Sequence, residues 1–124
     1  MREILFKAKR IDNGEWVVGD LSQHKSGKKF IKVGSATQSF EVSADTICQY
    51  TGLTDKNGCK IWENDVVEGL FLYRPKVSAI VDFENGAFGF KWSRGNVEEF
   101  SPFTSICNVS FEVIGNIFSG YTKY

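Results

Sequence analysis

The sequence has little histidine, cysteine or proline. His24 is the single histidine and lies in a lysine-rich stretch, so neither a catalytic triad nor a multi-histidine metal site is predicted. The cysteines Cys48, Cys59 and Cys107 are odd in number and form no C-x-x-C pair, which argues against a disulfide framework and a zinc site. No glycine-rich phosphate-binding pattern occurs. We therefore expect no cofactor, no catalytic residues and no enzymatic activity.

Long apolar runs and a net charge of one sign are also missing. No segment approaches the roughly 20 apolar residues that a membrane-spanning helix needs, and the N-terminus lacks the apolar stretch of a signal peptide. We therefore expect a cytoplasmic protein. The 15 basic and 15 acidic side chains cancel, which argues against a protein whose whole surface is built to bind polyanions.

Aromatic side chains are abundant, with 11 Phe, 3 Trp and 4 Tyr in 124 residues. Their burial can offset the entropy lost when the backbone is ordered, so the chain should fold unaided. The length is typical of one domain, and no repeat, linker or low-complexity tract divides it. We predict a single domain over residues 1–124.

The clearest local signal is Asn85-Gly86, which lies between two runs of alternating side chains. This pair tolerates the positive φ angles of a type I′ turn and predicts a β-hairpin with Phe83 opposite Phe88. Because no Arg or Lys interleaves on the aromatic face, we interpret that face as core and not as a stacking platform for bases. The residues of the predicted core face are Val77, Ala79, Val81, Phe83, Phe88, Phe90 and Trp92.

Two further turns contain Asn-Gly. An Asn13-Gly14 loop of two residues would pair Ile11 with Trp16 and leave apolar side chains on both faces of a first hairpin. The turn at residues 55–58 would place Asp55 opposite Lys60 in the same way. Next along the chain, Asn64 suits a left-handed backbone position before a strand, and residues 111–118 alternate like a closing strand.

Helix is scarce in this sequence. Short helical turns are predicted only at residues 43–47 and 101–106, where Pro102 would take the first helical position. Many short strands joined by close turns indicate a mostly β fold. We predict a strongly bent antiparallel sheet or a small β-barrel built of Asn-Gly hairpins, with a sandwich as the alternative.

Basic side chains gather toward the N-terminus, where residues 1–32 hold eight basic and four acidic side chains. Such a surface could contact nucleic acid or the acidic surface of a neighbouring copy. The plainer interpretation is that these charges are dispersed over solvated strands. Under the nucleic-acid hypothesis, the phosphate contacts are Lys7, Lys9, Arg10, Lys25, Lys28, Lys29 and Lys32.

Three carboxylates, Glu63, Asp65 and Glu68, lie close together in the sequence. Carboxylate oxygens are the ligands that Mg²⁺ prefers, so a metal-dependent enzyme is a third hypothesis. Surface turns are commonly acidic, however, and the spacing is not specific. We therefore assign no metal ligand.

Three sequence blocks, residues 49–67, 80–88 and 112–117, occur with the opening segment 2–8 in a recognisable order. Through them the chain resembles the YopX family of bacteriophage and prophage proteins. It departs from the family pattern at Asn64, where Gly is usual, and at residues 119–124, which replace an acidic tail. The resemblance implies a phage or prophage origin, expression inside a bacterium and a homo-oligomer, and it implies no established activity.

Two functions therefore compete at this stage. The leading hypothesis is a non-enzymatic binding or assembly module that acts through self-association or on a phage or host macromolecule. The second is a small nucleic-acid-binding β-barrel that uses the basic residues given above.

Overall fold

The computed structural model describes residues 3–34, 38–71, 74–94, 97–102 and 111–119. The fold is mostly β, as the sequence predicted, and its strands form two antiparallel sheets instead of one closed barrel among these residues. The chain divides into two compact units, Met1–Gly52 and Leu53–Tyr124. We call them the N-terminal and C-terminal units and describe each by itself. The expectation of a single domain stays a prediction.

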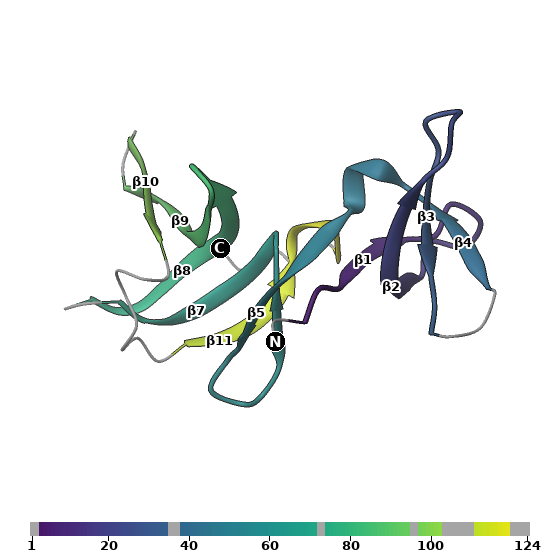
Figure 1. Cartoon of the computed structure of the whole chain (residues 1–124). Helices are drawn as coiled ribbons and strands as arrows, with labels where there is room; N and C mark the ends of the chain where they lie inside the picture. Colours follow the sequence, from purple (N-terminus) through teal and green to yellow (C-terminus); the bar gives the residue numbers. More distant parts are fainter. Residues whose placement is uncertain (1–2, 35–37, 72–73, 95–96, 103–110, 120–124) are drawn as a thin grey trace. The chain divides into compact units, whose positions relative to one another are not determined.

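The N-terminal unit is a curled sheet of short strands (Figure 1). Its strands lie in the order β4-β3-β2-β1-β5, and β5 continues to a pairing with β6. The 3₁₀ turn η1 confirms the helical turn predicted at residues 43–47. The bounds are β1 (Phe6–Lys9), β2 (Trp16–Gln23), β3 (Lys29–Lys32), β4 (Ser39–Val42), η1 (Ala44–Thr46) and β5 (Cys48–Thr54).

The first hairpin forms, but its predicted register is wrong by two residues. Lys9, and not Ile11, lies opposite Trp16. The reason is a longer loop, which Arg10 closes by donating its N–H to the carbonyl of Glu15 at 2.8 Å. Because the shift is an even number of residues, each side chain keeps its predicted face.

The sheet curls until its two ends meet, because Arg10 bridges Val42 and Ile11 donates its N–H to the Glu41 carbonyl at 3.0 Å. The inner face holds a core of Ala8, Ile31 and Val42, with exposed fractions of 0 to 2%. Strand alternation therefore places the intervening residues on an outer face. Among the residues of this outer face are Lys7, Lys9, Trp16, Val18, Asp20, Ser22, Phe30, Lys32 and Glu41.

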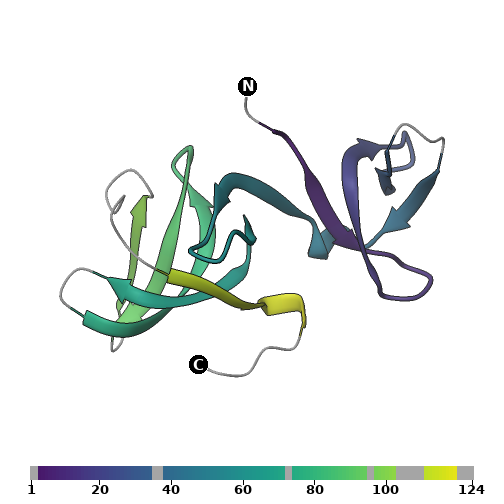
Figure 2. The same ribbon diagram turned by 90° about the horizontal axis from the view of Figure 1, so that it is seen from below.

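The C-terminal unit contains a five-stranded sheet in the order β10-β9-β8-β7-β11. Figure 2 shows β7, β8 and β11 running side by side. The bounds are β6 (Lys60–Trp62), β7 (Asp65–Phe71), β8 (Arg74–Glu84), β9 (Ala87–Arg94), β10 (Val97–Pro102), β11 (Phe111–Asn116) and the 3₁₀ turn η3 (Ile117–Ser119).

The β8–β9 hairpin confirms the predicted Asn85-Gly86 turn. Phe83 lies opposite Phe88 and Val81 opposite Phe90, and Asn85 has a φ of 52°. Val81 and Phe90 are buried in the core of the unit, with Ala79 beside them. Near the turn, however, Phe83 is 47% exposed. The side chain of Val77 is not among those that the structure describes.

Two other local predictions need correction. Asp55 donates its N–H to the carbonyl of Cys59, not to that of Lys60, so the third turn has one more loop residue than predicted. Gly58, with a φ of 81°, supplies the left-handed position that this longer turn requires. Ser101 and Pro102 are the last residues of β10 and therefore do not begin a helical turn. The rest of that predicted turn lies outside the described residues.

The described part of the chain contains only two short 3₁₀ turns in addition to its strands. Neither η1 nor η3 is long or apolar enough to span a membrane.

Candidate functional site

Most of the three sequence blocks that resemble the YopX pattern, residues 53–67, 80–88 and 112–117, lies in the C-terminal unit, and Asp55 links two of the blocks. Its carboxylate accepts hydrogen bonds from the backbone N–H groups of Asn57 and Cys59 at 2.9 Å, and of Val113 at 2.8 Å. Burial of the carboxylate opposes ionisation, but these N–H groups more than compensate and hold the pKa of Asp55 below its usual value. The carboxylate therefore joins the third turn to β11.

Asp65 makes a second link of the same kind. This residue is 2% exposed, and it accepts hydrogen bonds from the Trp62 N–H at 2.8 Å and from Asn116 Nδ2 at 2.9 Å. Beside it, Asn64 has the predicted left-handed conformation, with a φ of 68°, and donates its N–H to the Val81 carbonyl at 2.7 Å. The blocks thus hold one another in place through hydrogen bonds of Asp55, Asn64 and Asp65.

These bonds bear on the metal hypothesis. Both Asp65 oxygens are already engaged by the protein, and Glu63, Asp65 and Glu68 do not gather into a group that could hold a metal ion. No other group of three or more His, Cys, Asp or Glu side chains with such geometry occurs within the described ranges.

A pocket of about 460 Å³ in the C-terminal unit is lined partly by Asp82, Lys91 and Glu98. Lys91 Nζ lies 3.3 Å from Glu98, 3.6 Å from Glu84 and 3.7 Å from Asp82. The hydrogen bond to Glu98 is the main reason that the pKa of Lys91 is raised. The cluster therefore balances one ammonium group with three carboxylates.

His24 and the described cysteines show no catalytic arrangement. His24 lies in the β2–β3 loop, where its ring contacts Phe30 with 6.2 Å between centroids and its Nδ1 lies 3.4 Å from Ser26 Oγ. Cys48 is buried and its thiol donates to the Thr46 carbonyl at 3.3 Å, whereas Cys59 is exposed. Cys107 lies outside the described residues.

The seven predicted phosphate contacts divide into three groups and do not form one patch. Arg10 lies at the inner side of the sheet, over the Phe40 ring at 4.2 Å, and its guanidinium binds Asp12 with contacts of 2.9 and 2.6 Å. Lys29 is also on the inner side and donates to Gln23. Lys25 and Lys28 belong to the β2–β3 loop. The outer face keeps Lys7, Lys9 and Lys32.

Trp16 is the residue that sequence reasoning missed. Lys7 Nζ lies 4.7 Å and Lys9 Nζ 5.6 Å from the centroid of its ring, so two ammonium groups lie over one half-buried indole. Only the observed register reveals this cluster, because the predicted one places Ile11 opposite Trp16. The sequence signal that could have indicated this cluster is the alternation of Lys7, Ala8 and Lys9, which places both lysines on the strand face opposite to buried Ala8.

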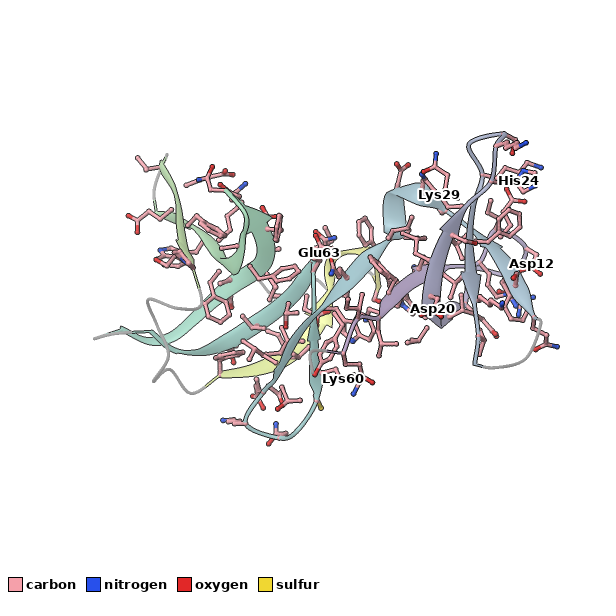
Figure 3. All side chains as sticks on the ribbon, viewed as in Figure 1. Asp12, Asp20, His24, Lys29, Lys60 and Glu63 are labelled. Atoms are coloured by element: carbon pink, nitrogen blue, oxygen red, sulfur yellow. The ribbon has the colours of Figure 1, made fainter. Side chains whose placement is uncertain are left out.

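The same outer face continues along β2 toward the loop. Lys32 lies opposite Asp20, and Phe30 lies opposite Ser22. In Figure 3, His24 and Lys29 lie toward the loop end of this hairpin, away from Asp20. The face therefore carries Trp16 at one end, Phe30 near the other and lysines along its length, with Asp20 and Glu41 as its acidic members.

Comparison with known proteins gives a family and a fold. A family model described as YopX protein matches residues 5–120. The crystal structure of protein EF1440 from Enterococcus faecalis is similar, with a TM-score of 0.54 and 23% sequence identity over 95% of each chain. At this identity the likeness concerns the fold alone. No curated protein matches the sequence.

Proposed function

This chain belongs to the YopX family, as its sequence predicted, and on that premise we propose that it is a non-enzymatic module that binds nucleic acid through the outer face of its N-terminal unit. The resemblance to phage and prophage proteins supports an origin in such an element and action in the cytoplasm of a bacterial host.

The cluster of Lys7, Trp16 and Lys9 is the observation that carries this proposal. Nucleic-acid surfaces combine cations for phosphates with aromatic rings for bases. Here both kinds of group occur on adjacent strands of one sheet face, with Lys32 on the third strand. Lysine stems can lie along the ring and still present their ammonium groups to solvent.

The acidic residues on this face are compatible with binding. Asp20 lies opposite Lys32, and Glu41 lies opposite Phe30. The face thus has three lysines and two carboxylates, and Lys25 and Lys28 of the adjoining loop add two positive charges. Such a balance favours moderate, salt-sensitive affinity. It disfavours pairing of this face with its own copy, since a two-fold interface would place the same lysine-rich patch against itself.

Substitutions that remove charges from the outer face should change its affinity for nucleic acid, with weaker binding when lysines are lost and tighter binding when a carboxylate is lost. We expect the triple variant Lys7→Gln, Lys9→Gln, Lys32→Gln to weaken binding about tenfold or more at low salt and to lower the log-log salt slope by roughly 2. The variant Asp20→Asn should tighten binding severalfold because it removes repulsion of phosphate. Fluorescence anisotropy with a labelled oligonucleotide over a salt series measures both effects.

The matched control is the pair Lys56→Gln, Lys60→Gln, which removes exposed lysines of the C-terminal unit and should leave affinity unchanged. The tighter binding expected of Asp20→Asn is informative because unfolding cannot produce it. Absence of binding by the wild-type protein at low salt would contradict the proposed function.

A second candidate function is self-assembly, which exposed apolar surface in the C-terminal unit favours. Phe83 is 47% exposed at the β8–β9 turn, with its ring packed on Phe88 at 4.9 Å between centroids. A second copy of the chain that covers the β8–β9 turn would remove the exposed apolar area of Phe83 from water. We expect size-exclusion chromatography with light scattering to show an oligomer that Phe83→Ser reduces toward monomer. A strict monomer at high concentration would count against assembly.

A further inference from the structure

We propose that the partner of the outer face is single-stranded nucleic acid, with one unpaired base stacked on Trp16 and another on Phe30. This inference rests on the proposed function. It adds that the nucleic acid is single-stranded and that Trp16 and Phe30 are the residues that distinguish a single strand from a duplex.

The spacing of the two aromatic residues suits an extended single strand. Trp16 begins β2 and Ser22 lies six residues further on, a span of roughly 20 Å along a strand. Phe30 is the partner of Ser22 on β3 and is half-buried like Trp16. Between the two rings, Lys32 lies where a connecting phosphate would pass. A nucleic-acid strand laid over β2 and β3 therefore meets Trp16, then Lys32 with Asp20 opposite it, and then Phe30.

The lysines beside Trp16 favour stacking and do not block it. Contacts between ammonium groups and an aromatic ring are weak at sites open to solvent, so a base can displace Lys7 or Lys9 from the ring. The displaced ammonium group stays close enough to bind the phosphate next to the stacked base. Bases in a duplex are already stacked on one another, and a duplex could use only the lysines.

The test compares an oligothymidine of about 12 nucleotides with a duplex of the same length, by anisotropy at low salt. We expect tighter binding of the single strand by the wild-type protein. Trp16→Leu should lose about tenfold in affinity for the single strand, and Trp16→Phe should lose less because it keeps a ring. Neither variant should change the salt slope, since no phosphate contact is removed.

The control is Val97→Ser, which alters an apolar side chain that is 60% exposed in β10 of the C-terminal unit and should leave affinity nearly unchanged. Thermal melting followed by circular dichroism verifies that every variant is folded. If Trp16→Leu is unstable, the affinity of Trp16→Phe still tests the role of the indole. Quenching of tryptophan fluorescence by the oligothymidine should be smaller in Trp16→Phe than in the wild type.

The outcomes separate this inference from the proposed function. Equal affinity for single strand and duplex, with Trp16→Leu unaffected and the triple lysine variant weakened, would overturn stacking and leave nucleic-acid binding in place. Displacement of the oligothymidine by polyglutamate of matched charge would also overturn the inference and indicate an acidic protein partner. No binding of either nucleic acid would remove both proposals.

Discussion

Replacement of Asp55 by alanine is expected to lower the free energy of unfolding by about 3 kcal/mol. The backbone N–H groups of Asn57, Cys59 and Val113 would lose their acceptor, and each buried donor left unpaired costs about 1–3 kcal/mol. Part of this cost is relieved where water reaches the turn, so the expected sum lies at the lower end. Urea unfolding should show a midpoint lower by about 1–2 M.

A suitable control is Asp45→Ala, because Asp45 is an exposed carboxylate in η1. Its effect should stay within about 0.5 kcal/mol, as is usual for surface positions. If Asp55→Ala were equally mild, the carboxylate would not be what connects the third turn to β11. Circular dichroism can follow both unfolding transitions.

The contribution of Asp55 should also depend on pH, with a sign that its hydrogen bonds determine. Its burial opposes ionisation, but the N–H donors of Val113, Cys59 and Asn57 outweigh that effect and lower its pKa in the folded chain. A carboxyl with a lowered pKa stabilises the fold above its unfolded pKa, about 3.9, and loses that contribution as the pH falls through the folded value. The stability gap between wild type and Asp55→Asn should therefore be complete at pH 7 and shrink below about pH 4.

Local turn chemistry made part of this fold predictable. Asn85-Gly86 fixed the β8–β9 register because the pair itself forms the whole loop, and Asn64 has the left-handed conformation expected of it. Asn13-Gly14 carries the same signal, but there the loop includes Ile11 and Asp12, and Arg10 closes it through Glu15. A sequence pattern indicates that a hairpin exists more reliably than it gives the loop length.

The candidate site was harder to predict because it depends on pairing between strands. The basic residues were visible in the sequence, but their division into inner, outer and loop groups follows from β1, β2 and β3 together. Trp16 became a candidate only when the register placed it beside Lys7 and Lys9. Likewise, the Asp55 carboxylate bonds to Val113, which lies 58 residues away, and no local pattern announces such a partner.

Gly19→Ala is expected to be at least as damaging as the loss of Asp55, and it acts in the unit that carries the proposed binding face. A Cβ at this position would lie 2.1 Å from the Lys32 carbonyl oxygen and 2.9 Å from its carbonyl carbon. Both atoms belong to the backbone of β3, which cannot move without breaking its pairing with β2. We expect a loss of about 3 kcal/mol or more in unfolding free energy, at the upper end for overpacking.

Gly14→Ala is the comparison that isolates the steric cause. Gly14 has a φ of 72° and open space around its Cβ position, so alanine there should cost only the left-handed backbone strain, about 1–2 kcal/mol. Urea unfolding and oligonucleotide anisotropy should both be measured, because Gly19 lies between Val18 and Asp20 on β2. Gly19→Ala should weaken binding together with stability, whereas Gly14→Ala should retain affinity. A stable Gly19→Ala protein would mean that β3 can withdraw from β2, and the tight curl of the N-terminal sheet would then not depend on this glycine.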